Sequence, residues 1–296
     1  MKALQVLMIF VAAVWLTGCG DQSADNGAEA TMPPPAEQAT DRAPAADADD
    51  GDLLDKAIAG EHRSDGNRAR DQYRHPKETL TFFGLEPGMT VVELFPGGGW
   101  YTEVLAPALG EDGRLIGAQF EASAPPAYRP GVVARYQEML TRPEFANTEM
   151  VTLDDSGVLQ GVDDASVDRV LTFRNVHNWM VAGTFDAVVA EAARVLKPGG
   201  VFGVVEHRAA EGVDPAESAR RGYVPETYVI ERANAAGFVL EARSDINANP
   251  NDTKDYARGV WELPPTLGGD EAERDARRAI GESDRMTLKF VKPADR

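Results

Sequence analysis

The stretch Val91–Tyr101, VVELFPGGGWY, decides the fold of this chain of 296 residues. Its apolar first half predicts a buried strand over Thr90–Phe95, and the three glycines that follow predict a turn. Apolar residues then recur at helical spacing as far as Gly110. Glycines at such a turn let the backbone approach a ligand closely. A strand, a glycine turn and a helix in direct succession therefore indicate the ligand-binding unit of an α/β fold, with a purely structural turn as the alternative.

The rest of the chain repeats this alternation of strands and helices. Further strands, rich in β-branched and aromatic residues, are predicted at Arg114–Phe120, Thr148–Leu153, Arg169–Phe173, Val201–Glu206, Phe238–Ser244 and Met286–Val291. The clearest helix begins after Thr184 and stops at Pro198-Gly199-Gly200, and another covers Pro225–Ala236 before Gly237. We therefore predict an α/β fold with a doubly wound, mostly parallel seven-stranded sheet, which binds its ligand at the carboxyl ends of its strands.

The N-terminus is typical of an export signal. Residues 1–18 begin with positive charge and continue with an apolar run, Ala3–Leu16, that is shorter than the roughly 20 residues needed to span a bilayer. The run ends at Leu16-Thr17-Gly18-Cys19, which resembles the bacterial lipobox, where the signal peptide is removed before the cysteine and the cysteine is acylated. A plain signal peptide or a short membrane anchor is the alternative. We expect an exported bacterial lipoprotein, anchored to a membrane by Cys19 and facing the periplasm or the cell surface.

Residues 19–52 are predicted to form a disordered acidic tether. Nine acidic residues and one arginine lie between residues 20 and 52, which leaves this segment a net charge of −8. So little apolar surface, combined with so much like charge, cannot offset the entropy lost on ordering. The remaining residues, 53–296, are expected to form one globular domain.

The composition of the chain excludes several functions. It has 30 basic and 48 acidic residues, a net charge of −18, and its basic residues are spread along the sequence. Nucleic acid or an anionic lipid surface needs a localised positive patch, so neither is expected as a partner. Cys19 is the only cysteine, which excludes an internal disulfide and every thiolate-cluster metal site, and no metal is predicted. Nothing in the sequence indicates an oligomeric state.

The segment from about Leu80 to Val291 resembles the class I S-adenosylmethionine-dependent methyltransferases, whose first motif is an acidic residue followed by alternating glycines. Glu93 and two of the glycines match this motif, while Phe95 stands at the usual first glycine. A narrower resemblance, to exported predicted methyltransferases, is carried by Arg74-His75-Pro76, Pro96–Tyr101, Arg174–Trp179, Trp261–Pro265 and Met286–Phe290.

The resemblance implies S-adenosylmethionine as the cofactor. It implies that the amino acid end of this cofactor is held by Glu93, Gly97, Gly98 and Gly99. The acidic residue expected at the end of the second strand, which takes the ribose hydroxyls, is replaced by Gln119, and Glu121 is its candidate substitute. Asp154, after the third strand, matches the acidic position near the adenine. For each of these acids, a solvated loop charge is the alternative.

Polar and aromatic residues gather after the fourth strand, in Arg174–Trp179. The resemblance places there the groups that face the methyl group and its acceptor, so Arg174, Asn175 and His177 are the candidate catalytic residues. Imidazole titrates near neutral pH, which suits it to take a proton from the acceptor, whereas a histidine bonded into its loop is the alternative. Glu206-His207-Arg208, after the fifth strand, is a second candidate for the acceptor side.

We therefore expect an enzyme that transfers a methyl group from S-adenosylmethionine to a small or envelope-associated acceptor. The main alternative is a non-catalytic binding module on a degenerate methyltransferase fold, because Phe95 and Gln119 depart from the family pattern and the cofactor is made in the cytosol. A nicotinamide oxidoreductase fits less well, since Thr102 stands where its motif needs a third glycine or alanine. The segment Arg70–His75 is expected to form either a lid or a surface cluster of ion pairs.

Overall fold

The computed structural model describes residues 50–123 and 126–294. The expected signal peptide, Cys19 and most of the expected tether lie outside these residues. Helix α1 (Asp50–Ala59) begins ahead of residue 53, where we predicted the start of the globular domain. Within the described part of the chain, no helix is both long enough and apolar enough to cross a membrane.

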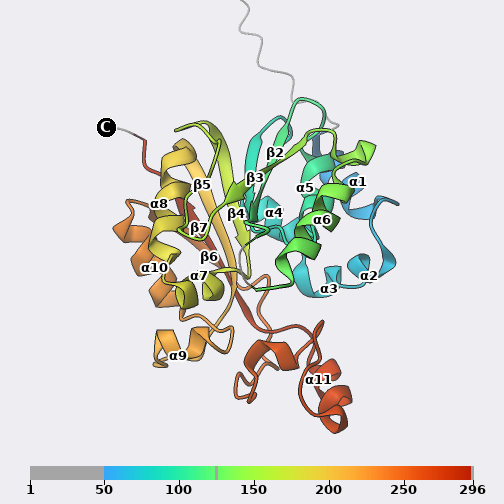
Figure 1. The fold of residues 1–296 in the computed structure, drawn as a ribbon, viewed down its shortest axis with the longest axis vertical. Coiled ribbons are helices and arrows are strands. Elements are labelled where there is room, and N and C mark those ends of the chain that lie inside the picture. Colours follow the sequence, from blue (N-terminus) through green and yellow to red (C-terminus); the bar gives the residue numbers. More distant parts are fainter. Residues whose placement is uncertain (1–49, 124–125, 295–296) are drawn as a thin grey trace, which may run out of the picture. The chain divides into compact units, whose positions relative to one another are not determined.

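A seven-stranded sheet lies at the centre of the domain, in the order β3-β2-β1-β4-β5-β7-β6 (Figure 1). Its strands are β1 (Thr90–Leu94), β2 (Arg114–Phe120), β3 (Thr148–Leu153), β4 (Val167–Phe173), β5 (Leu196–His207), β6 (Val239–Ser244) and β7 (Arg285–Val291). Strand β7 is antiparallel to β5 and to β6, and all other neighbouring strands are parallel. The predicted α/β fold, with a doubly wound and mostly parallel sheet, is confirmed.

Both faces of the sheet are covered by helices, which explains why its central strands are almost continuously apolar. The helices are α1, α2 (Asp65–Arg68), α3 (Asp71–Arg74), α4 (Pro76–Phe82), α5 (Thr102–Ala108), α6 (Arg129–Met139), α7 (Val176–Ala182), α8 (Phe185–Val195), α9 (Pro215–Ala219), α10 (Glu226–Ala235) and α11 (Arg274–Ile280). Successive residues of a strand point to opposite faces. Val91 therefore packs in one core with α1, α4 and α5, while Val92 packs in the other with α7, α8 and α10.

The end of α8 differs from the sequence prediction. The helix stops at Val195, and β5 begins at the next residue, so Pro198-Gly199-Gly200 lies inside the strand instead of before it. The register between β4 and β5 shifts between Val167 and Arg169, which accommodates the extra residues. Proline and glycine were interpreted as a helix stop, yet here they mark an irregular section of a strand.

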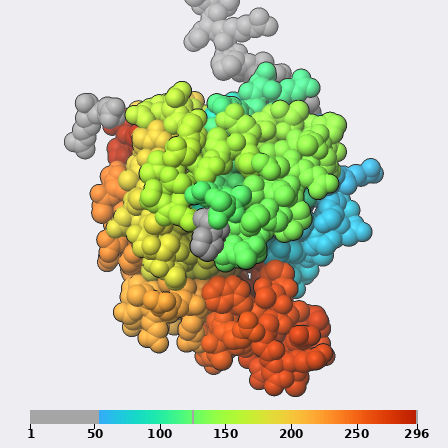
Figure 2. Space-filling model, in the orientation of Figure 1, coloured from blue at the N-terminus to red at the C-terminus, as the bar shows by residue number. Residues whose placement is uncertain are grey.

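The connection between β6 and β7, residues 245–284, lies at the carboxyl edge of the parallel strands (Figure 1). It contains the short 3₁₀ helices Gly259–Glu262 and Glu271–Glu273 as well as α11. Figure 2 shows it as the orange-red region beside the helices that cover the sheet. The carboxyl ends of β1 and β4 therefore meet residues from near the end of the chain.

Candidate active site

A cavity of about 450 Å³ opens at the carboxyl ends of β1 and β4. Its wall combines the N-terminal segment around α3, the loops after β1 and β4, the end of β5 and the β6–β7 connection. The predicted site residues that line it are Glu93, Gly97, Gly98, Arg174, Asn175 and His177. The parallel topology thus brings together groups that lie in separate parts of the sequence.

The glycine loop after β1 offers open backbone to this cavity. A Cβ atom added at Gly97 or Gly98 would meet nothing within 4 Å, so a ligand can approach the main chain there. Phe95 has φ +50, the left-handed conformation that favours glycine, at the position where the family motif has its first glycine. Its ring contacts Phe120 and Trp179, with centroids 5.4 and 5.3 Å away. The loop therefore keeps the glycine conformation without the glycine.

Gly99 serves a different purpose from its two neighbours. It does not line the cavity, and a Cβ at this position would collide with the side chain of Met139 in α6. Its φ of +82 also favours glycine. The structure therefore places Gly99 against a helix, which differs from the expected contact with the cofactor.

Three polar residues at the ends of β2 and β3, namely Gln119, Glu121 and Asp154, lie outside the cavity lining. Gln119 is buried, and its side-chain amide donates a hydrogen bond of 3.0 Å to the carbonyl of Gly97, which holds the glycine loop. Glu121 is exposed to solvent, and its carboxylate accepts a hydrogen bond from the hydroxyl of Ser123. Asp154 accepts hydrogen bonds from Ser156, Val158 and Gln160, and these bonds, that of the Ser156 hydroxyl first, lower its pKa. Asp154 therefore stabilises the turn that follows β3.

Glu93 is a buried carboxyl group on the cavity wall. It accepts a hydrogen bond of 2.6 Å from the hydroxyl of Thr102. Burial raises the pKa of Glu93 to about 7, although Thr102 and Arg174 both favour its charged form. A group that titrates near neutral pH in a cleft is typical of a functional site.

Asn175 fixes the loop after β4 to the end of β1. Its side-chain amide donates to the carbonyl of Leu94 at 3.0 Å and to that of Phe95 at 3.3 Å. The side-chain NH₂ group of Asn175 is therefore used in hydrogen bonds to the backbone, so this residue positions the loop after β4. Arg174, next to it, has φ +64 and lines the same cavity.

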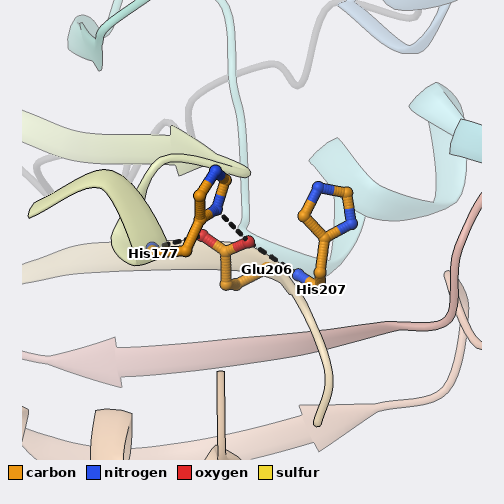
Figure 3. Close-up of side chains that lie close together, drawn as sticks. All are labelled: His177, Glu206 and His207. Carbon is orange, nitrogen blue, oxygen red and sulfur yellow. Dashed lines mark hydrogen bonds and ion pairs between the residues drawn. The ribbon is translucent and has the colours of Figure 1, made fainter. Parts of the chain in front are cut away.

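His177 and Glu206 form a buried pair between the start of α7 and the end of β5 (Figure 3). One carboxylate oxygen of Glu206 lies 3.1 Å from Nδ1 of His177 and accepts the backbone N–H of His207 at 2.8 Å. The other accepts the backbone N–H groups of Val176 and His177 at 2.6 and 3.4 Å. Because an ionised carboxylate only accepts, Nδ1 of His177 donates, and the lone pair of the ring is on Nε2.

His207 completes a cluster whose spacing could also hold a metal ion. The ligand atoms of His177, Glu206 and His207 all lie within 4.8 Å of one another. However, both oxygens of Glu206 already accept N–H groups. Burial, followed by the neighbouring His177 and the nearby arginines, lowers the pKa of His207 well below its ordinary value. Those arginines would repel a cation as well, so the contacts favour an imidazole–carboxylate pair.

The sequence analysis missed Glu282, which lines the cavity from the β6–β7 connection. It pairs with Arg70 at 2.6 Å and with Arg74 at 3.3 Å. Both arginines line the cavity, so the segment around α3 forms its wall and is not an exposed cluster of ion pairs. Arg74 is buried, and its guanidinium lies 4.5 Å from the ring centroid of Trp100.

Comparison with known proteins agrees with this geometry. Residues 95–204 match the family model of a methyltransferase domain. A SAM dependent methyltransferase from Aquifex aeolicus shares the fold, with 16% identity, a TM-score of 0.51, and coverage of 76% of this chain and 93% of that one. The [4+2]-cyclase SpnF also shares it, with 17% identity, a TM-score of 0.52, and coverage of 83% and 94%. No curated protein matches the sequence. Identities this low show the fold alone.

The sheet and the glycine loop form the Rossmann-like fold that these solved structures share. Residues 95–204, the part of the chain that the family model matches, form a methyltransferase domain. S-Adenosylmethionine is the cofactor of this domain, and the open backbone of the glycine loop fits its amino acid end.

Proposed function

We propose that this protein transfers the methyl group of S-adenosylmethionine to a small acceptor at the bacterial envelope, with His177 as the base. One observation carries the proposal. A single cavity joins the open backbone of Gly97 and Gly98 to His177, whose Nδ1 is held by Glu206. A cofactor site and a base that share one cavity are what methyl transfer to a protonated acceptor requires.

In this proposal, Glu93 and the backbone of Gly97 and Gly98 hold the amino acid end of the cofactor, and a ribose that extends beyond the cavity lining would meet the exposed Glu121. S-Adenosylmethionine supplies an electrophilic methyl group on a sulfonium. Nε2 of His177 accepts the proton that the acceptor loses, and the carboxylate of Glu206 stabilises the imidazolium that results. Trp261, whose ring centroid is 6.0 Å from that of His177, lies beside the base in the wall of the cavity.

The cofactor test is titration calorimetry of the full chain with S-adenosylhomocysteine. We expect binding by the wild type, and unchanged affinity in His177→Ala, because that side chain acts on the acceptor. No heat and no shift in melting temperature at millimolar ligand would refute the methyltransferase and favour the binding module. The two departures from the family motif leave the glycine loop in place, since Phe95 adopts the left-handed conformation of the usual glycine and Gln119 donates a hydrogen bond to the carbonyl of Gly97.

The envelope location depends on Cys19 and the apolar run that precedes it. We propose that the mature chain begins at this cysteine and is held on a membrane by its acyl groups. Cys19→Ser should release the protein from the membrane fraction or leave it unprocessed, as seen by fractionation and mass spectrometry. If mass and fractionation remain unchanged, the protein is not a lipoprotein.

A further inference from the structure

Four arginines surround one carboxylate in the wall of the cavity. The ion pairs of Glu282, with their N–O distances, are to Arg70 (2.6 Å), Arg285 (3.2 Å), Arg74 (3.3 Å) and Arg174 (3.8 Å). These arginines outweigh the burial of Glu282, which alone would raise its pKa, and together hold that pKa at about 2. The carboxylate is therefore always charged at neutral pH, and it still balances only one of four positive charges.

Several nitrogens of these guanidinium groups lack hydrogen-bond partners among the described residues. Nη2 of Arg70 and Nη1 of Arg74 are buried, and neither has a partner among the described residues. The guanidinium of Arg174 makes no hydrogen bond to the described part of the chain, and Glu282 at 3.8 Å is its nearest ion pair. Burial, and then the charge of Arg174, lowers the pKa of Arg74 well below its ordinary value. Buried donors without acceptors are rare in folded proteins, so the cluster is short of negative charge.

Other groups at the cavity do not supply this charge. Glu93 has a pKa of about 7, so it is only partly ionised at neutral pH. Glu206 is occupied by the N–H groups at the start of α7 and by His177. The cofactor carries one carboxylate against an ammonium and a sulfonium, and therefore adds net positive charge. The missing negative charge is left for the acceptor to bring.

We propose that the methyl acceptor carries an oxyanion, either a carboxylate or a phosphate, that binds to Arg70, Arg74 and Arg174. This inference rests on the proposed function, which it deepens by naming the class of substrate. Guanidinium groups bind both oxyanions through paired N–H bonds, and several of them can share one ligand. Arg174 lies three residues before His177, just ahead of α7, and both line the cavity, so an anion bound there holds the acceptor beside the base.

The probes are inorganic phosphate and acetate, titrated into the full chain by calorimetry against chloride at equal ionic strength. The wild type should bind at least one of them, and the arm that binds tells a phosphate site from a carboxylate site. Arg174→Gln should weaken that binding about tenfold or more, while Arg174→Lys keeps the charge and loses less. The matched control is Arg278→Gln, an exposed arginine of α11, which should bind like the wild type. No binding by the wild type, or equal binding by Arg174→Gln, overturns the proposal.

A second titration separates this inference from the proposed function. S-Adenosylhomocysteine should bind equally well with and without the bound oxyanion, because the acceptor and the cofactor occupy different parts of the cavity. Competition between the two would show that the arginines hold the cofactor's own carboxylate, which also overturns the proposal. If the oxyanion binds and S-adenosylhomocysteine does not, the proposed function fails while the oxyanion site stands. Thermal melts confirm that each variant is folded.

Discussion

Glu93 should make the stability of the domain depend on pH. Burial raises its pKa from 4.5 to about 7, so the native state holds the proton more tightly than the unfolded chain. The resulting contribution to the free energy of unfolding is complete below pH 4.5 and is lost as the pH rises through 7. A shift of about 2.5 pKa units corresponds to roughly 3 kcal/mol. Glu93→Gln keeps the shape of the side chain and cannot titrate, so this contribution should disappear.

The measurement is urea unfolding of the wild type and Glu93→Gln between about pH 5 and pH 8, over which about 2.5 kcal/mol of the contribution falls. The stability of the variant relative to the wild type should increase by this amount as the pH rises. His207 contributes with the opposite sign, because its lowered pKa adds stability as the pH rises, but it is present in both proteins and cancels in the difference. The exposed Glu61→Gln is the control, and its curve should parallel that of the wild type. A parallel curve for Glu93→Gln would refute a buried, titrating Glu93.

Four further predictions test the site. Gly98→Val should weaken S-adenosylhomocysteine binding about 100-fold at unchanged melting temperature, because the valine side chain fills open space where the ligand binds. Gly99→Val should instead lower the melting temperature. The reverse pattern would contradict the roles of the two glycines. Glu206→Gln should destabilise the protein by about 1–3 kcal/mol, since a buried N–H loses its acceptor. It should also change the imidazole ¹⁵N shifts of His177, and unaltered shifts would show that Glu206 does not set the tautomer of this ring. One equivalent of zinc should leave the melting temperature unchanged, whereas a clear rise would establish a metal site. Glu282→Gln should lower the stability by about 3–5 kcal/mol, and added phosphate should restore part of it; a fully stable variant would show that the arginines need no counter-charge.

The sheet could be predicted from the sequence because its signals are local. Strands β2 and β3 begin and end at the predicted residues, since neither contains a proline that would interrupt a strand. Strand β5 begins earlier than predicted, because pairing with its neighbour overrides the tendency of Pro198-Gly199-Gly200 to end an element. The local sequence therefore predicts the ends of a strand only where pairing with a neighbouring strand does not extend it.

The residues of the candidate site likewise differ in whether the sequence could locate them. Residues that directly follow β1 and β4, such as Gly97 and His177, could be located because the carboxyl ends of parallel strands meet. Glu282 could not, because its partners Arg70 and Arg74 lie more than 200 residues away in the chain. An isolated glutamate has no pattern that separates a buried counter-ion from a solvated surface charge.

Destabilising features gather at the cavity, and this argues that the pocket is in use. Phe95 and Arg174 both have positive φ angles, which side chains rarely adopt. Glu93 is a carboxyl group and Arg74 a guanidinium in surroundings that penalise their charged forms. Each feature costs stability, and none is needed to form the sheet, because its two cores are built from apolar side chains. A fold whose pocket had lost its ligands would become more stable by replacing these groups, and their joint presence therefore favours an enzyme over a degenerate relative.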